Sequence, residues 1–273
     1  MRAVLVIIVC VLGLWWVSTD TAEVRYKVAV SVRDGNLLYT NSSVWSRGST
    51  EYGLLQVIGI PAGGQQFYAE AIPIELPGKG LLMMLPVGRG KPEPDTLMAS
   101  SLPFYAFELG QPSLDTTLDL VRRAADLRTG TSAPVFCDYR GALNIEEAAR
   151  ASQKPGSENP INTSNTTESN QPSRGCFIFA FMKDRRVSST FRVTAPDSRG
   201  YIAEAGVRIH RVTVTITDEH ATERITRYLP WLDSFVDYSN KNQYKMQLAK
   251  SSRQKLEDQL FKYGRYIRRE YYY

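Results

Sequence analysis

The N-terminal segment constrains the architecture of this chain more than any other feature. Residues 3–17 are all apolar or glycine, Arg2 precedes them, and Trp15 and Trp16 stand near the end of the run. Tryptophans favour the membrane–water interface, and a positive charge ahead of an apolar run favours a cytoplasmic N-terminus. We therefore expect residues 1–19 to form a transmembrane anchor, although the run is shorter than the roughly 20 residues of most spanning helices.

A cleaved secretory signal peptide is the alternative interpretation of the same segment. Signal peptides have a basic start and a short apolar run, but they end in small residues at the cleavage site. The candidate cut after Ala22 has Asp20 two positions earlier, which fits that pattern poorly. Under either interpretation the chain from about residue 23 onward lies outside the cytoplasm: anchored in the first case, secreted in the second.

Export changes the interpretation of the cysteines. Cys137 and Cys176 are the only two outside the anchor, and they do not form a CxxC motif. In an oxidising compartment such a pair favours a disulfide, which would close a loop of roughly 40 residues and stabilise the fold by about 3–4 kcal/mol. Two unpaired buried thiols, or a catalytic cysteine, are the alternatives.

Hydrophobic periodicity predicts a β-rich domain over residues 23–238. Apolar residues alternate with polar ones over residues 24–32, Asp34 and Gly35 follow, and residues 37–45 again favour a strand, which together predicts a hairpin. Further strands and helices follow from the periodicity and from flanking glycines and prolines. The expected strands are residues 54–60, 67–74, 81–87, 176–182 and 207–216, the last with a bulge near His210 or Arg211, and the expected helices are residues 114–125, 201–205 and 218–229. We expect an α+β domain: an antiparallel sheet with a few packed helices.

Two segments stand apart from this domain. Residues 152–175 consist mainly of Ser, Thr, Asn, Pro and Gly, and such a composition predicts a disordered insertion. Residues 239–273 combine a weak helical pattern with an excess of positive charge, which predicts a basic amphipathic helix. The basic residues of this tail are Lys241, Lys245, Lys250, Arg253, Lys255, Lys262, Arg265, Arg268 and Arg269.

The tail's charge bears on possible partners. The whole chain carries a formal net charge of +5. The tail contributes more than this sum, so we expect a negatively charged partner to meet the tail rather than the folded body. Such a partner is an anionic membrane surface or an acidic protein, and export argues against nucleic acid. The simpler alternative is a solvated helix that lies on the domain.

The sequence shows no assembled catalytic set. His210 and His220 are the only histidines, and Asp218, Glu219 and His220 resemble the acidic first turn of a helix more than a metal site. We therefore expect no catalytic residue, cofactor or metal, and a protein that is not an enzyme. Two alternatives stay open: a hydrolase that gathers His220, Asp218 and a serine from distant loops, and a module that binds a ligand in the apolar interior of the sheet.

Several segments carry a resemblance to a known family. Residues 212–232, with Asp218 and Glu219 followed by the run RYLPWL, resemble the C-terminal signature of an uncharacterised family of Gram-negative bacterial envelope proteins. Residues 41–44, 69–76 and 81–85 are similar to that family in the expected order. The resemblance implies a single-pass protein of the inner membrane with its domain in the periplasm, and it implies no activity. The lack of an assembled catalytic set, together with the β framework and the charged tail, favours an interaction or structural role.

Overall fold

The computed structural model describes residues 19–52, 63–88, 99–110, 117–135, 177–197, 199–232 and 267–272. Within these ranges no helix is both long and apolar enough to cross a membrane. The anchor up to residue 18, Cys137, Cys176, the insertion 152–175 and residues 239–266 of the tail lie outside them. The anchor, the disulfide and the disordered insertion therefore stay predictions.

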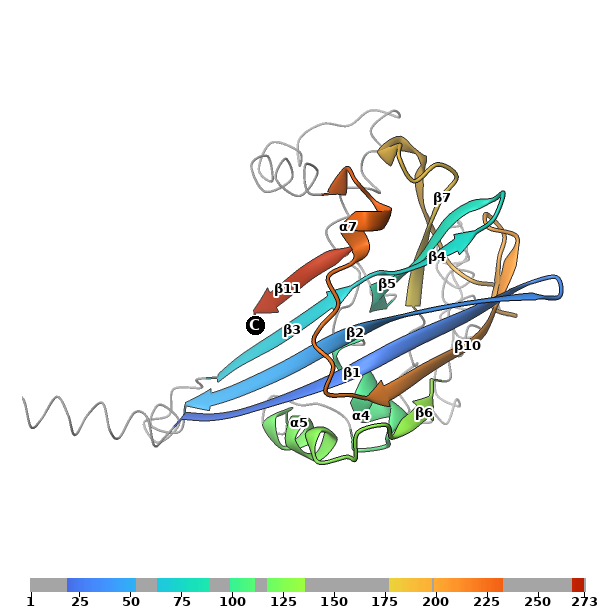
Figure 1. Ribbon diagram of the computed structural model, residues 1–273. Helices are drawn as coiled ribbons and strands as arrows, with labels where there is room; N and C mark the ends of the chain where they lie inside the picture. The colour runs from blue at the N-terminus through green and yellow to red at the C-terminus, as the bar shows by residue number, and fades with distance from the viewer. Residues whose placement is uncertain are drawn as a thin grey trace, which may run out of the picture.

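A large antiparallel sheet forms the centre of the fold (Figure 1). Its strands lie in the order β11-β3-β2-β1-β10-β6, and a short strand β9 also pairs with β10. The bounds are β1 Thr19–Asp34, β2 Leu37–Tyr52, β3 Gly63–Glu70, β6 Ser132–Pro134, β9 Tyr201–Ile202, β10 Val207–Ile216 and β11 Arg268–Tyr272. The predicted antiparallel, β-rich domain is confirmed.

The β1–β2 hairpin is longer than its alternating pattern predicts. Asp34 pairs with Leu37, so the turn consists of Gly35 and Asn36, and Gly35 has a φ of 56° that favours glycine. The pairing continues to Thr19 opposite Tyr52, beyond the alternating segment, because polar residues such as Thr and Ser also suit an exposed part of a strand.

The predicted bulge in β10 is confirmed. Ser31 pairs with Arg211 whereas Val32 pairs with Ile209, which leaves His210 without an opposite residue. Because one extra residue restores the alternation, Val207 and Val212 both face the core.

A smaller antiparallel sheet packs against the large one. Its order is β4-β5-β7-β8, with bounds β4 Ile72–Leu76, β5 Gly80–Gly88, β7 Phe177–Met182 and β8 Phe191–Thr194. Only Ala71 separates β3 from β4, so the chain passes directly from one sheet to the other. The prediction of a single strand over residues 67–74 is therefore wrong at this bend.

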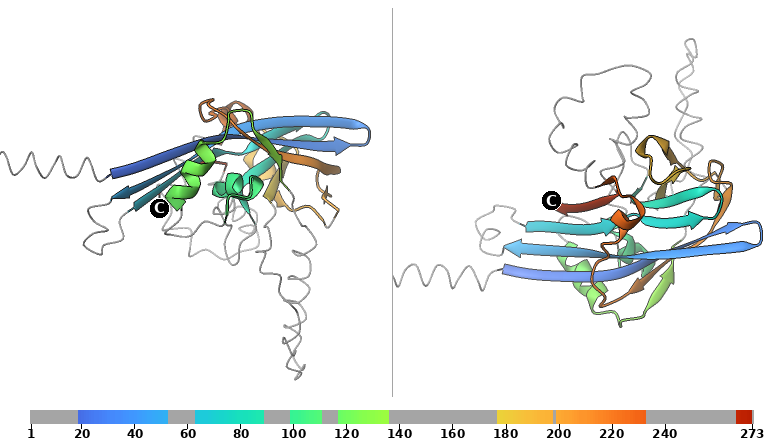
Figure 2. Two further views of the ribbon diagram at one scale, coloured as in Figure 1. Left: turned by 90° about the horizontal axis from the view of Figure 1, so that it is seen from below. Right: turned by 45° about the horizontal axis from the view of Figure 1, so that its top comes forward.

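Helices cover one face of the large sheet, as the view from below shows (Figure 2). They are α4, Leu102–Ala106, and α5, Thr117–Ala125. The α5 helix was expected from its periodicity, and it buries Leu118 and Val121 as predicted, although Ala124 rather than Ala125 completes the apolar stripe. The α4 helix was not expected from the sequence. Pro103 lies in its first turn, where a helix tolerates proline.

Trp45 on β2 joins the two sheets into one core. Its ring is fully buried and meets Tyr26 and Phe67 of the large sheet and Phe177 of the small sheet edge-on, with ring centroids 6.1–6.3 Å apart. The indole N–H donates to the Glu70 carbonyl oxygen at 2.9 Å. Edge-to-face contacts of this kind favour one fixed arrangement of rings.

Arg47, two residues further along β2, is buried as well. Its guanidinium donates to Ser100 at 2.6 Å and to Gln65 at 2.8 Å, and it lies 5.1 Å from the centre of the Phe104 ring. The bond to Ser100 connects the large sheet to α4, because Ser100 lies two residues before the start of that helix. A buried charge is tolerated only when it is bonded in this way.

Residues 217–224, which we name the strap, cross the opposite face of the large sheet as an irregular segment (Figure 1). Thr222 donates its backbone N–H to the Val44 carbonyl oxygen at 3.0 Å and accepts the Val44 N–H at 2.6 Å. The backbone N–H of Arg224 donates to the Glu70 carboxylate at 2.8 Å. The helix predicted from residue 218 is wrong, because these bonds to the sheet replace helical ones; only α7, Ile225–Tyr228, is helical.

One further prediction of helix is wrong, and the predicted tail helix is wrong over residues 268–272. Residues 201–205 form strand β9 and a turn rather than a helix. At the end of the tail, β11 pairs with β3, so Arg268 lies opposite Glu70 and Arg269 opposite Ala69. Ile267 is buried and its carbonyl oxygen accepts the Ala71 N–H at 2.8 Å, which shows that this end of the tail belongs to the domain.

Candidate functional site

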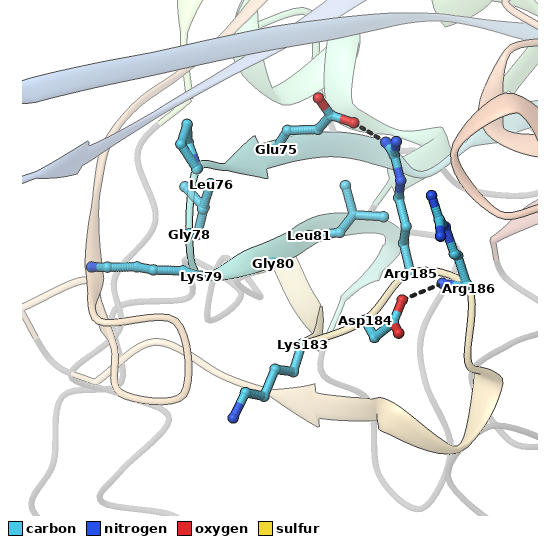
Figure 3. Close-up of a pocket in the computed structure, with 11 residues that line it drawn as sticks. Glu75, Leu76, Gly78, Lys79, Gly80, Leu81, Lys183, Asp184, Arg185 and Arg186 are labelled. Atoms are coloured by element: carbon cyan, nitrogen blue, oxygen red, sulfur yellow. Dashed lines mark hydrogen bonds and ion pairs between the residues drawn. The ribbon is translucent and has the colours of Figure 1, made fainter.

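A groove lined by charged residues lies between the β4–β5 turn and the loop after β7 (Figure 3). Its volume is about 570 Å³. The charged residues that line it are Glu75, Lys79, Lys183, Asp184, Arg185 and Arg186, and the remainder are Leu, Pro and Gly. We name this feature the basic groove, because four of its six charged side chains are cationic.

The loop after β7, residues 183–187, sets the direction of two arginines; we name it the arginine loop. The Asp184 carboxylate accepts the Arg186 backbone N–H at 2.9 Å, and the Val187 N–H donates to the Asp184 carbonyl oxygen at 3.2 Å. An aspartate that bonds its own turn in this way fixes the turn's central residues. In consequence, the side chains of Arg185 and Arg186 leave the loop side by side (Figure 3).

Neighbouring segments hold the base of the arginine loop. The Thr190 hydroxyl is 2.8 Å from the carbonyl oxygens of both Asp184 and Val187, to which it can donate. The indole N–H of Trp231, beyond the strap, donates to the Arg185 carbonyl oxygen at 2.9 Å. Thr190 and Trp231 therefore restrain a loop whose own side chains are exposed.

The two arginines differ in their partners. Arg185 forms an ion pair with Glu75 on β4. The Arg186 guanidinium forms no hydrogen bond or ion pair with any other residue of the described ranges, and the same holds for the Lys183 ammonium. Lys183 points away from Arg186, so Arg186 is the uncompensated charge beside the Arg185–Glu75 pair (Figure 3).

Lys79 fixes the other wall of the basic groove. Its ammonium lies 2.8 Å from the Asp34 carboxylate at the end of β1 and 3.3 Å from the Gly206 carbonyl oxygen. Gly80, next in sequence, has a φ of 136°, and a Cβ there would lie 2.2 Å from the Met182 carbonyl oxygen. The turn is therefore packed closely against the end of β7.

The basic groove was not found from the sequence. The sequence pattern predicted no role for residues 183–186, although four consecutive charged residues there were the available signal. The argument from net charge also assigned an anionic partner to the tail. Net charge does not show how the charges are distributed. In the structure, four cationic side chains of the folded body line a single groove.

The residues that the sequence singled out lie elsewhere. Asp218, Glu219 and His220 are exposed on the strap; Glu219 pairs with Lys27, and the His220 ring lies 3.5 Å from the Arg25 guanidinium. No group of three or more His, Cys, Asp or Glu residues that could hold a metal occurs in the described ranges. Cys137 and Cys176 lie outside those ranges, as do the tail's basic residues before Arg268.

Comparisons with known proteins add no relative. No family model matches the chain, no curated protein matches it, and no solved structure matches it. Function must therefore be argued from the geometry of this chain alone.

Proposed function

We propose that this protein is a membrane-anchored envelope protein with a non-catalytic interaction role, and that its β-rich domain binds an anionic ligand in the basic groove. The apolar run at residues 3–17 supports the anchor. The resemblance of residues 212–232 to a family of Gram-negative envelope proteins supports an inner-membrane location with the domain in the periplasm.

The observation that carries the proposal is the pair of arginine side chains that leave a restrained loop side by side (Figure 3). Arg186 has no partner within the described ranges, and Arg185 shares its charge with one carboxylate. Guanidinium groups bind phosphate through paired N–H donors, and a loop already held in place loses little entropy when it binds. A phosphate-bearing ligand is the class that fits best.

The lining of the basic groove supports binding rather than catalysis. The residues that line it include no histidine, serine, threonine or cysteine. Its carboxylates are engaged, Glu75 with Arg185 and Asp184 with the arginine loop. The groove therefore offers charge and shape to an anion, without a nucleophile placed beside a general base.

Calorimetric titration tests the proposal. Inorganic pyrophosphate serves as the probe and is titrated into the full chain in a nonionic detergent. We expect saturable binding that weakens as salt increases, because the attraction is between exposed charges. The R185Q/R186Q variant should bind at least about tenfold more weakly, since hydrogen bonds between charged groups contribute about 1.5–3 kcal/mol each.

A matched variant controls for the loss of charge. Arg123 on α5 and Arg128 after it are exposed and form no side-chain bond within the described ranges, so R123Q/R128Q removes the same charge elsewhere. Its affinity for pyrophosphate should equal that of the unmodified chain. Equal losses in the two double variants, or no binding to the unmodified chain, would show that the basic groove is not the site.

A further inference from the structure

The closed end of the β1–β2 hairpin extends beyond the rest of the described chain (Figures 1 and 2). Its apolar side chains are exposed. Leu37 is 61% exposed, Leu38 52% and Tyr201 on the adjoining β9 40%. Among the described residues only one other large hydrophobic side chain, Val187, is comparably exposed. Apolar exposure is thus concentrated at one end of the large sheet.

The strand register aligns two of these side chains with two arginines. Leu38 pairs with Arg33, Arg33 pairs with Arg208, and Arg208 pairs with Tyr201. These four residues, which we name the tip row, cross β2, β1, β10 and β9, and all four are exposed. Directly opposite side chains in antiparallel strands have Cβ atoms about 5 Å apart, so the two arginines are neighbours between a leucine and a tyrosine.

The charge of the tip row is not neutralised by ion pairs. Like charges directly opposite each other destabilise a sheet, yet Arg33 faces Arg208, and Arg211 follows nearby opposite Ser31. None of these three arginines takes part in an ion pair within the described ranges. Arg208 acts on the Asp197 carboxylate without forming an ion pair: backbone N–H bonds from Tyr201 and Arg199 lower the pKa of Asp197, and the charges of Arg199 and Arg208 lower it further.

We propose that this end of the hairpin binds an anionic lipid surface. Leu37 and Leu38 are adjacent in one strand, so their side chains point to opposite faces of the hairpin. A rigid protein surface would cover one face, whereas lipid surrounds an inserted tip and buries both leucines. The arginines of the tip row then meet lipid phosphates, and Tyr201 lies at the level that interfacial aromatic residues favour.

This contact is separate from the N-terminal anchor. It adjoins one wall of the basic groove, where Lys79 pairs with Asp34 beside the tip, but it uses other side chains. β1 has 16 residues. A strand of that length spans roughly 50 Å between its start, just after the apolar run, and the tip. The proposal thus assigns the domain a second lipid contact, far along the sheet from the anchor, and it does not depend on what the basic groove binds.

Vesicle flotation tests this second contact. The full chain is first placed in nanodiscs of phosphatidylcholine, so that its apolar run is occupied. Vesicles of phosphatidylcholine alone, or with 30% phosphatidylglycerol, are then added as the probe, with salt near physiological. We expect flotation of the nanodiscs with the anionic vesicles only.

Paired variants identify the residues responsible. R33Q/R208Q should reduce partitioning roughly 25-fold, at about fivefold for each arginine near an anionic surface. L37S/L38S should reduce it at least about tenfold through lost apolar burial. The control R123Q/R128Q should partition like the unmodified chain, and all the substituted side chains are exposed, so folding should be preserved.

Several outcomes would overturn the proposal. Equal flotation with neutral and anionic vesicles would show that the arginines do not contribute to binding. If R123Q/R128Q lost as much partitioning as R33Q/R208Q, binding would depend on overall charge rather than on the tip row. Failure to float, together with cross-linking from position 38 to an envelope protein, would show that the occupant is a protein instead. Loss of flotation in R185Q/R186Q alone would assign the lipid contact to the basic groove.

Discussion

Replacement of Trp45 tests the single core that joins the two sheets. Burial of the whole ring and its contacts with three other aromatic rings make W45A a large deletion. Truncation of a buried tryptophan to alanine costs about 3–5 kcal/mol, and the lost edge contacts place this site at the upper end of that range. The loss would be a large part of a typical stability of about 5–15 kcal/mol.

The substitution W45F separates the packing of the ring from its hydrogen bond. Phenylalanine keeps an aromatic ring but leaves the Glu70 carbonyl oxygen without its indole donor. We expect a cost of about 1–3 kcal/mol, from the lost bond and the smaller volume. The control W231F removes the bond to the Arg185 carbonyl oxygen at a partly exposed site and should cost about 1 kcal/mol.

Urea unfolding of the full chain, followed by far-ultraviolet circular dichroism, measures these changes. The urea concentration at the midpoint should decrease in the order unmodified, W231F, W45F, W45A. Each protein that folds should show one cooperative transition. A W45A midpoint within about 1 kcal/mol of the unmodified chain, or separate transitions for the two sheets, would refute the argument that Trp45 unites them.

Three further predictions concern stability, measured by the same unfolding assay. T222V removes the acceptor for the buried Val44 N–H and should cost about 1–3 kcal/mol, whereas T222S should cost less than about 1 kcal/mol. G80A should cost at least about 2 kcal/mol, because the added carbon meets the Met182 carbonyl oxygen at a positive φ. Burial raises the pKa of Tyr26, and the nearby Arg47 charge opposes this; the unfolded chain therefore loses that proton first, and stability should decrease above about pH 10 by up to about 1.4 kcal/mol per pH unit. Y26F should show a shallower alkaline loss, and identical pH profiles would contradict the assignment.

Local patterns predicted the elements whose structure is decided locally. The alternation in β1, the bulge at His210 and the apolar stripe of α5 follow from side-chain periodicity, which a single sequence displays. The structure of the strap was not predicted, because its hydrogen bonds are made to Val44 and Glu70, which lie far away in the sequence. Such tertiary hydrogen bonds override the helical preference of a segment whose acidic first turn and apolar spacing favour a helix.

The candidate sites escaped the sequence for a related reason. The tip row depends on the pairing of Arg33 with Arg208, which the sequence separates widely and only the register of β1 and β10 brings together. The basic groove depends on the approach of the β4–β5 turn to the arginine loop. Histidines and cysteines are candidates from sequence alone because their chemistry is distinctive. Single arginines on strands and loops are ordinary surface residues and give no such signal.

The most direct test of the proposed function is to locate a bound anion. Crystals of the full chain soaked in tungstate, a heavy tetrahedral analogue of phosphate, would show the anion in an anomalous difference map. The account predicts a peak within hydrogen-bond distance of the guanidinium groups of Arg185 and Arg186. A map with no peak in the basic groove, or with peaks only at the tip row or the control pair Arg123 and Arg128, would contradict it.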